Sequence, residues 1–250
     1  MWGIIPAAGE GKRIQPLAFS KELLPVGFDQ LVERKKPRAV SEFIVERLIV
    51  GGATKICFII SPSKGDIVRY HAHGTPHALF VYVVQPEPVG LCDAVFRPAG
   101  LIAANEQVLI GLPDTVWFPT EGFRFLPDGQ LSLLLFPVKS PKYFDAVVLD
   151  ADNRVQTIEV KQEIPTTHWI WGAIKMSGAI YHDLRQLWIQ RQRQDEFLGT
   201  LINAWIANGG RAFGFQKGFH YLDVGTIDGL HLAFSQLMED KQGEPSATEQ

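Results

Sequence analysis

Small residues and basic side chains gather near the start of the sequence. A short apolar run ends in Pro6-Ala7-Ala8-Gly9-Glu10-Gly11, and Lys12, Arg13 and Lys21 follow. Glycine and alanine leave backbone N–H groups open to an approaching anion. Lysine and arginine supply the positive charge that phosphate oxygens require. The segment predicts a polyphosphate cradle, with a purely structural strand-to-helix turn as the alternative.

Two better-known phosphate loops do not fit this segment. The dinucleotide fingerprint requires a third glycine or an alanine where this chain has Ile14. A Walker loop requires Ser or Thr after Gly-Lys, where this chain has Arg13, and an earlier glycine where it has Pro6. The segment is therefore a candidate phosphate cradle of another kind.

Two aspartates in loop-like contexts could hold a metal ion. Asp114 lies in Gly-Leu-Pro-Asp-Thr after an apolar run, and Asp223 lies in His-Tyr-Leu-Asp-Val-Gly-Thr. Magnesium takes few protein carboxylates and completes its shell with substrate phosphates and water. The alternative is that Asp114 caps a turn and Asp223 caps a helix N-terminus.

Short apolar runs alternate with amphipathic stretches, and these elements must position the polar residues. The predicted strands are Trp2–Pro6, Lys55–Ile60, Leu79–Val84, Val108–Leu112, Leu131–Val138, Ala146–Leu149, Val155–Glu159, Trp169–Met176 and Arg211–Phe215. The predicted helices are Ser41–Gly51, Gly65–His71, Leu91–Ala99, Gly178–Leu187, Phe197–Asn208 and Ile227–Met238.

The order of these elements predicts an α/β fold with a Rossmann-like, mostly parallel sheet flanked by helices. Residues 131–176 are rich in strands, which indicates an antiparallel insertion or lid. Ligands of open parallel sheets bind beyond the carboxyl ends of the strands. The glycine loop, the segment from Gln85 to Gly90 and Asp114 each follow a predicted strand, so we expect them to share one crevice.

Composition excludes several classes of protein. The chain has 250 residues, 46% hydrophobic and 20% charged. Its net charge of −3 gives no reason to expect binding to nucleic acid or anionic membranes, since either would favour a basic surface. Cys57 and Cys92 lie in apolar surroundings, typical of buried thiols in a reducing compartment. With no apolar run of about 20 residues and no signal-like start, the expected location is the cytoplasm.

With these residues in place, the chain resembles the sugar-1-phosphate nucleotidylyltransferases, especially those that make dTDP- or UDP-glucose. Their first motif, Ala-Ala-Gly-x-Gly-Thr-Arg and then Pro-Lys-x-x-Leu-Pro, is similar to Ala7–Arg13 and Ser20–Pro25. Further segments match in family order: Gln85–Leu91 with the nucleobase segment, Gly111–Asp114 with the metal motif, Ile158–Gln162 with Glu-Lys-Pro, Gly172–Ile174 with Gly-Ile-Tyr, and Tyr221–Thr226 with Trp-x-Asp-x-Gly-Thr.

The resemblance implies that a nucleoside triphosphate, dTTP or UTP favoured, reacts with a sugar 1-phosphate to give an NDP-sugar and pyrophosphate. It implies catalytic roles for Arg13, Lys21, Asp114 and Asp223, with Mg²⁺ between the two aspartates. It implies nucleotide binding by Ala8, Gly9, Gly11, Gln85 and Gly90, and sugar-phosphate binding by Lys161 and Gly172. It also implies one domain over residues 1–238, with a nucleotide half (1–125), a strand-rich sugar half (126–226) and a disordered tail (239–250).

The sugar half departs more from the family pattern than the nucleotide half. Asp145 stands where the family has glycine, and Val160 stands where it has glutamate, so one acceptor for a sugar hydroxyl is lost. In the nucleotide half, Ser20 replaces a proline and Lys12 a threonine. Two alternatives therefore stay open: a nucleotide-binding protein of the same fold without turnover, and a transferase that uses CTP or a non-sugar phosphate. The sequence fixes neither the sugar nor the choice between thymine and uracil, and it leaves homo-oligomer formation open.

Overall fold

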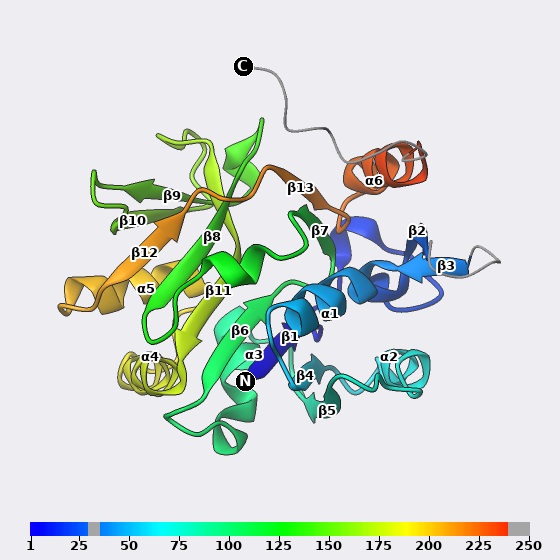
Figure 1. Ribbon diagram of the computed structural model, residues 1–250, viewed down its shortest axis with the longest axis horizontal. Coiled ribbons are helices and arrows are strands. Elements are labelled where there is room, and N and C mark those ends of the chain that lie inside the picture. The colour runs from blue at the N-terminus through cyan, green and yellow to red at the C-terminus, as the bar shows by residue number, and fades with distance from the viewer. Residues whose placement is uncertain (30–35, 240–250) are drawn as a thin grey trace.

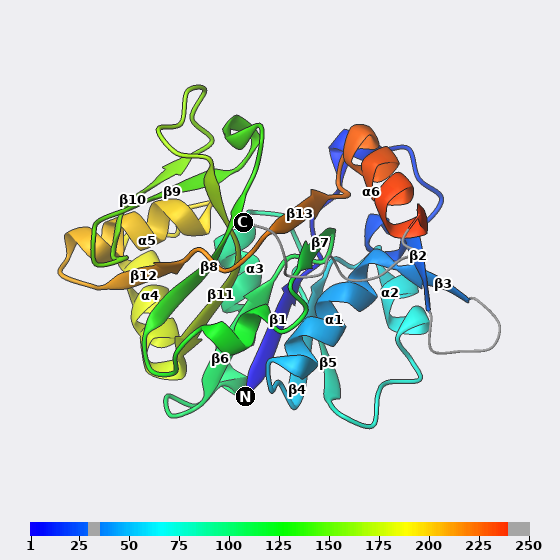
Figure 2. The same ribbon diagram turned by 45° about the horizontal axis from the view of Figure 1, so that its top comes forward.

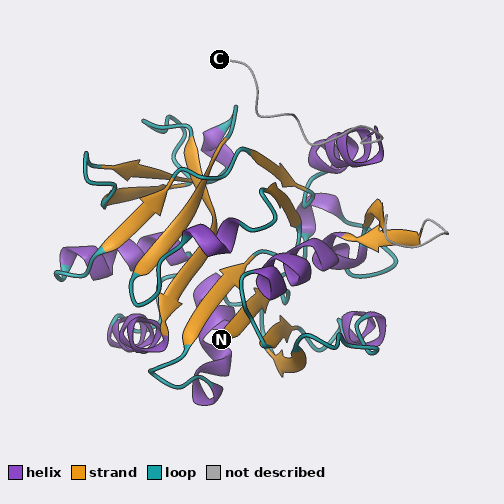
Figure 3. Ribbon diagram, in the orientation of Figure 1, coloured by secondary structure: helices purple, strands orange, loops and turns teal. Residues whose placement is uncertain are grey.

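A mixed β-sheet forms the centre of the molecule in the computed structural model, which describes residues 1–29 and 36–239 (Figure 1). Within these residues the sheet has nine strands, along the path β10-β9-β11-β6-β1-β4-β5, and β8 joins β11 to β12. Helices lie on both sides of this layer (Figure 3). The predicted α/β class with flanking helices is confirmed.

The parallel part of the sheet is built from the most apolar runs of the sequence. It consists of β1 (Trp2–Pro6), β4 (Lys55–Ile60), β5 (Leu79–Val84) and β6 (Gln107–Gly111). β1 pairs in parallel with both β4 and β6, and β4 with β5. β1, β4 and β6 lie inside the sheet and are mostly buried, and such strands read as continuous apolar runs, which explains why sequence located them to within a residue. β5 lies at the edge and is partly exposed.

The strand-rich middle of the chain continues this sheet instead of forming a separate lid. β11 (Trp169–Ser177) runs antiparallel to β6 and to β8 (Leu131–Pro137). β9 (Asp145–Leu149) and β10 (Val155–Val160) form a hairpin at its edge, and β12 (Ala212–Phe215) lies parallel to β8. The insertion is antiparallel, as expected, but it shares a hydrogen-bonded edge with the parallel strands.

Helices cover the two faces of the sheet with separate apolar clusters (Figure 2). One face packs against α3 (Leu91–Phe96), α4 (Gly178–Gln190) and α5 (Leu198–Ala207). The other packs against α1 (Val40–Val50) and α2 (Gly65–Tyr70). The predicted helix Leu91–Ala99 is shorter than expected because Pro98 lacks an N–H, and a 3₁₀ turn continues from Arg97 to Leu101.

Two small ribbons were not predicted from the sequence. β2 (Pro25–Asp29) pairs with β3 (Lys36–Ala39), and β7 (Thr115–Phe118) pairs antiparallel with β13 (His220–Asp223). A third apolar cluster joins both ribbons to α6 (Ile227–Glu239). The β7–β13 ribbon brings together segments far apart in the chain, and both aspartates singled out above lie at one end of it.

The remaining sequence-based expectations have mixed outcomes. Cys57 and Cys92 are free and buried, as predicted, and burial raises the pKa of the Cys57 thiol to about 12. In the described part of the chain, no helix has the length and apolar character needed to cross a bilayer. The predicted disordered tail, apart from Glu239, lies outside the described residues.

Candidate active site

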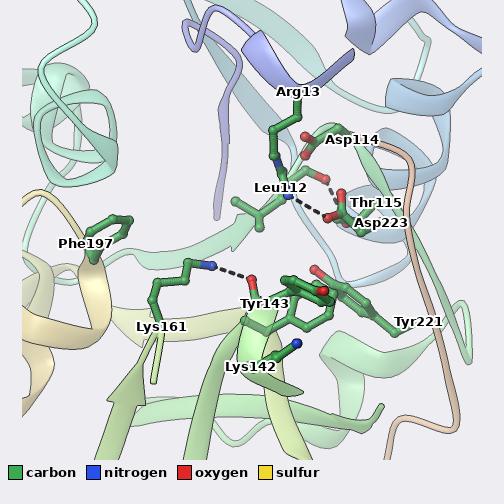
Figure 4. A pocket seen from close by; sticks show the side chains of 11 residues that line it. Arg13, Leu112, Asp114, Thr115, Lys142, Tyr143, Lys161, Phe197, Tyr221 and Asp223 are labelled. Carbon is green, nitrogen blue, oxygen red and sulfur yellow. Dashed lines mark hydrogen bonds and ion pairs between the residues drawn. The ribbon is translucent and has the colours of Figure 1, made fainter. Parts of the chain in front are cut away.

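A cavity of about 480 Å³ opens between the first phosphate-loop segment and the β9–β10 edge of the sheet. Figure 4 shows Arg13 entering from one side and Lys161 from the other, with Asp114 and Asp223 beside Arg13. The full lining is Arg13, Leu112, Asp114, Thr115, Lys142, Tyr143, Phe144, Lys161, Phe197, Tyr221 and Asp223. Predicted residues from both halves of the chain therefore face one space.

The β7–β13 ribbon places the two aspartates together. Thr115 pairs with Asp223 in the ladder, and the N–H of Val224 donates to the carbonyl of Asp114 at 2.9 Å. Asp114 directly precedes β7 and Asp223 ends β13, so their side chains meet at the end of the ribbon. A ribbon of two short strands thus brings together two aspartates that lie 109 positions apart in the sequence.

Each aspartate has a basic partner from the N-terminal segment. Lys21 Nζ lies 2.5 Å from Asp114 Oδ2, and Arg13 Nη1 lies 3.3 Å from Asp223 Oδ2. Burial acts to raise the pKa of Asp114, but the ammonium of Lys21 outweighs it and lowers that pKa. Burial, together with the charge of Asp114, raises the pKa of Asp223. Two like charges held in a poorly hydrated space favour binding of a further cation.

The space between the carboxylates suits a metal ion. A Cβ built on Gly225 would lie 2.8 Å from Asp114 Oδ2, 3.0 Å from Asp223 Oδ1 and 3.2 Å from Arg13 Nη2. Oxygens from both aspartates therefore surround a small volume that Gly225 leaves open. No cluster of three or more His, Cys, Asp or Glu side chains suited to a metal occurs among residues 1–29 and 36–239. Two carboxylates are a donor set that fits Mg²⁺, which takes its other oxygens from substrate phosphates and water.

The glycine loop lies directly against Lys21. Gly11 has φ = 67°, a left-handed conformation that favours glycine. A Cβ on Gly11 would lie 2.8 Å from Lys21 Cδ, whereas a Cβ on Gly9 would have nothing within 4 Å. Ala8 is buried where the loop leaves β1. The loop keeps Gly9 open on one side and lets Lys21 approach on the other.

A second cavity, of about 730 Å³, lies on the other side of the same segment. Its walls include Glu10 and Gln15 from the loop and Lys64 and Asp66 from the turn after β4. Neighbouring residues of the N-terminal segment thus line different cavities, Arg13 the first and Glu10 and Gln15 the second.

Gln85 and Gly90 follow β5 and line neither cavity. Gln85 is buried, and its Nε2 donates to Asp93 Oδ2 at 2.7 Å and to the carbonyl of Gly90 at 3.2 Å. Gly90 has φ = 114°, and a Cβ there would lie 3.0 Å from the backbone of Glu196. Both residues therefore have structural partners at the position where a nucleobase was expected.

The predicted sugar-phosphate residues occupy different environments. Lys161, with φ = 48°, lines the first cavity and donates from Nζ to the carbonyl of Tyr143 at 2.8 Å. Gly172 lies beneath the cavity wall, since a Cβ there would lie 2.6 Å from ring atoms of both Phe136 and Tyr221. The absent side chain of Gly172 makes room for Tyr221, one of the lining residues.

Asp145 is the least satisfied polar group near this cavity. Its side chain is 7% exposed, Oδ1 is a buried oxygen with no hydrogen-bond partner, and Lys161 Nζ lies 3.8 Å away. Trp171 Nε1 donates to Oδ2 at 3.4 Å. Burial raises the pKa of Asp145, and Lys161 opposes that shift. In the β9–β10 ladder Asp145 faces Val160, so the two positions that depart from the family pattern are cross-strand partners.

Several residues in or beside the cavity were not picked out from the sequence as site residues. Gly225 was quoted within a motif without a role, and its signal would have been its distance of two residues from Asp223. Tyr143 and Phe197 come from a 3₁₀ turn and a helix start whose place beside the cavity depends on the β9–β10 edge. No local pattern marks either of them.

Comparisons with known proteins agree with this geometry. A family model described as Nucleotidyl transferase matches residues 2–240. Glucose-1-phosphate thymidylyltransferase of Mycolicibacterium smegmatis is 28% identical over 97% of this chain and 85% of its own length.

Solved structures share the fold over nearly the whole chain. A Bacillus anthracis protein with the provisional name glucose-1-phosphate thymidylyltransferase, solved with sucrose, has a TM-score of 0.79 at 22% identity and covers 97% of both chains. UDP-glucose pyrophosphorylase of Acinetobacter baumannii has a TM-score of 0.75 at 17% identity and covers 96% of this chain and 94% of its own. At these identities the structures support the fold alone.

Proposed function

We propose, since this chain belongs to the nucleotidyl transferase family, that it joins a nucleoside triphosphate to a sugar 1-phosphate, giving an NDP-sugar and pyrophosphate. The name of the curated relative supports a sugar phosphate as acceptor and dTTP as donor, and the motif resemblance to enzymes that make dTDP- or UDP-glucose keeps UTP beside dTTP. The observation that carries the proposal is the convergence of Arg13, Lys21, Asp114 and Asp223 around one space that Lys161 also faces.

The reaction depends on position and charge more than on proton transfer. An oxygen of the sugar phosphate forms a bond to the α-phosphorus while the bond from that phosphorus to the departing pyrophosphate oxygen breaks. Negative charge builds up on the pyrophosphate, and cations held in advance stabilise it. The site residues must therefore hold two polyanions in line and neutralise both.

The N-terminal residues are assigned to the triphosphate. The backbone from Ala8 through Gly9 to Gly11 cradles it, and Arg13 binds the departing pyrophosphate through its planar set of donors. Lys21 neutralises the α-phosphate region as a compact charge. To do so its ammonium must exchange part of its contact with Asp114 for a phosphate oxygen.

Asp114 and Asp223 are the residues that would hold a magnesium ion beside Gly225. When bound, the ion would supply Lewis-acid neutralisation of the phosphate oxygens. The chain's own contribution is to bring the two carboxylates together at the end of the β7–β13 ribbon and to leave room beside them at Gly225, which has no side chain.

We assign Gln85 and Gly90 to the nucleobase, and their existing hydrogen bonds restrict how a base can bind. An amide can both donate to and accept from the imide edge of thymine or uracil. Because Gln85 Nε2 already donates to Asp93 and Gly90, a base must either use the amide oxygen or displace one of these bonds. Because thymine and uracil share this imide edge, the amide of Gln85 does not discriminate between them.

Lys161 is assigned to the phosphate of the sugar substrate. Its ammonium faces the cavity and is 48% exposed, so a phosphate can reach it. Gly172, also predicted to bind the sugar phosphate, acts in this proposal through the place it leaves for Tyr221. The predicted division of one domain into a nucleotide half (1–125) and a sugar half (126–226) is retained on these assignments.

A second candidate function is nucleotide binding without turnover. The buried, unpartnered Oδ1 of Asp145 beside Lys161 favours it, because a nearby carboxylate weakens phosphate binding. A transferase that uses CTP or a non-sugar phosphate is favoured by the same departure in the sugar half. Three further expectations from the sequence stay predictions: a cytoplasmic location, no nucleic-acid or membrane partner, and formation of a homo-oligomer.

The test is pyrophosphate release from pairs of dTTP, UTP, CTP or GTP with candidate sugar 1-phosphates in the presence of Mg²⁺. We expect release with dTTP or UTP and loss of release in Asp114→Asn. Release that no pair raises above the Asp114→Asn background would overturn the proposal. Calorimetric binding of a triphosphate without product would then favour the second candidate.

A further inference from the structure

The residues on either side of Lys21 are both held by one short turn. Ser20 donates from its backbone N–H to Asp66 Oδ2 at 2.7 Å and from its hydroxyl to Asp66 Oδ1 at 2.6 Å. Glu22 Oε1 accepts from Lys64 Nζ at 2.7 Å. Lys64 and Asp66 lie on opposite sides of Gly65, where β4 leads into α2. Each neighbour of Lys21 is thus tied to the turn Lys64–Asp66.

The Lys64 contact also reaches the glycine loop. Lys64 Nζ donates to the carbonyl of Ala7 at 2.7 Å, at the point where β1 becomes the loop. A single buried ammonium therefore fixes the start of the loop and the segment that carries Lys21. Gly11 touches Lys21 at the other end of the loop, so the two segments are held in register at both ends.

The charged groups that make these contacts are buried from water. The side chain of Glu22 is 1% exposed, that of Lys64 is 10% exposed, and Glu22 Oε2 has no hydrogen-bond partner. Burial raises the pKa of Glu22, and Lys64 opposes that shift. A buried ion pair contributes little net stability, and a registry role is one of its better-attested uses. The arrangement therefore calls for an explanation other than stability.

We propose that the turn Lys64–Asp66 positions the side chain of Lys21 for the triphosphate, acting through Ser20 and Glu22. This inference rests on the proposed function of Lys21 and extends it to four positioning residues, none of which is assigned to the substrates: Ser20, Glu22, Lys64 and Asp66. The turn holds the backbone of the lysine from both sides, so the ammonium can leave Asp114 for a phosphate while its backbone stays fixed.

Serine at position 20 is what makes the Asp66 contact possible. The resembled family has proline here, and proline has neither an N–H nor a hydroxyl. Ser20 has φ = −61°, which proline also adopts, so Ser20→Pro fits the backbone and removes both hydrogen bonds. Ser20→Ala removes the hydroxyl bond alone, which gives a graded pair of variants.

The experiment compares Ser20→Ala, Ser20→Pro and Asp66→Asn with the wild type. Asp150→Asn is the matched control, because Asp150 Oδ1 accepts the backbone N–H groups of Asp152 and Arg154 in the distant β9–β10 turn. The readouts are kcat, KM for the triphosphate, melting temperature, and hydrogen exchange of peptides covering residues 17–24. We expect Ser20→Pro to lower kcat about tenfold, in line with the cost of slight misplacement of a catalytic group. We expect Ser20→Ala to have a smaller effect, and exchange to rise in residues 17–24 and nowhere else.

Ser20→Thr keeps both donors and is expected to retain kcat. Wild-type kcat in both Ser20→Pro and Asp66→Asn would overturn the proposal, as would an equal fall in Asp150→Asn. A lower melting temperature with faster exchange throughout the chain would also overturn it, because that pattern indicates a purely structural role.

The proposal and the proposed function fail in different ways. If the wild type turns over no substrate pair, the proposed function fails, and the dissociation constant of the triphosphate replaces kcat as the readout. An unchanged dissociation constant in Ser20→Pro would then overturn the positioning role as well. Weaker binding with localised exchange in residues 17–24 would support it.

Discussion

The two sides of the central cavity differ in how completely their charged groups are paired. On the triphosphate side, Lys21, Arg13 and Lys64 each meet a carboxylate contributed by a distant segment. On the sugar side, Lys161 bonds to a backbone carbonyl, and Asp145 keeps a buried oxygen without a hydrogen-bond partner. Each side keeps one buried carboxylate oxygen without a hydrogen-bond partner, Glu22 Oε2 on the first and Asp145 Oδ1 on the second. The ion pairs of the first side are closer, at 2.5–3.3 Å, than the 3.8 Å between Lys161 and Asp145 on the second.

This difference indicates where substrate identity is decided. Every triphosphate presents the same phosphate chain, so a fixed arrangement of charges suits it. A buried carboxylate oxygen without a hydrogen-bond donor costs free energy. An acceptor substrate must therefore either donate a hydrogen bond to Asp145 or bind away from it. The sugar side is therefore the one expected to select among acceptors.

The largest effect on turnover is expected from a substitution at Gly225, beside the two carboxylates. Gly225→Ala would place a methyl group against both carboxylates and Arg13. We expect turnover to fall about 100-fold to 1,000-fold, on the scale of losing a preorganised electrostatic contact. Steady-state kinetics and Mn²⁺ titration measure it. Gly100→Ala is the control, since a Cβ there has nothing within 4 Å, and equal activity in the two variants would contradict the prediction.

Gly172→Ala tests whether the sugar side is built by packing. The added methyl would lie 2.6 Å from ring atoms of Phe136 and Tyr221. Overpacking of this kind destabilises by about 1–3 kcal/mol. Urea unfolding should show that loss, together with a raised KM for the sugar phosphate and an unchanged KM for the triphosphate. Unaltered stability would mean that Gly172 is not a packing position.

Lys161→Met separates the two substrates by charge. We expect KM for the sugar phosphate to rise about tenfold, because a charge-assisted contact to phosphate is lost. KM for the triphosphate should stay unchanged. Lys142→Met is the comparison, as Lys142 lines the same cavity with its ammonium over the Tyr143 ring. A larger effect in Lys142→Met would move the phosphate site to that lysine.

The smallest effect concerns the pH dependence of stability at Asp145. Burial raises the pKa of Asp145 in the folded protein, so ionisation is penalised there. Its contribution to stability should fall as pH rises from the usual aspartate pKa through the raised one. Asp145→Asn should therefore melt above the wild type at pH 8, and the difference should shrink below about pH 4. A wild type that melts higher at pH 8 would show that Lys161 stabilises the ionised form.

The parallel core was predictable from sequence because its signal is local. Trp2–Pro6 and Lys55–Ile60 were predicted with their observed bounds, since buried central strands are continuous apolar runs. Leu79–Val84 was also predicted with its observed bounds, from an uninterrupted apolar run, although it lies at the edge of the sheet and is only partly buried. The β7–β13 ribbon was missed because each strand has four residues and its partner lies more than 100 residues away. The pairing of Lys21 with Asp114 was equally invisible, although both residues were named.

The sugar side shows the same limit in another form. Asp145 and Val160 were noted as separate departures, and only the strand register reveals that they face each other. The engagement of Gln85 with Asp93 likewise depends on how α3 packs against the end of β5. Sequence identified residue types suited to the chemistry, whereas three-dimensional packing decides which of them are already engaged.

The β7–β13 ribbon also imposes an order of events during synthesis on the ribosome. All four parallel strands have been made once residue 111 has emerged, but β13 follows more than 100 residues later. A nascent chain that lacks His220–Asp223 contains the glycine loop, Lys21 and Asp114, yet has no second carboxylate to complete the acidic pair. The nascent chain therefore completes its acidic pair only after Asp223 has been made, when all strands from β1 to β12 have already been synthesised.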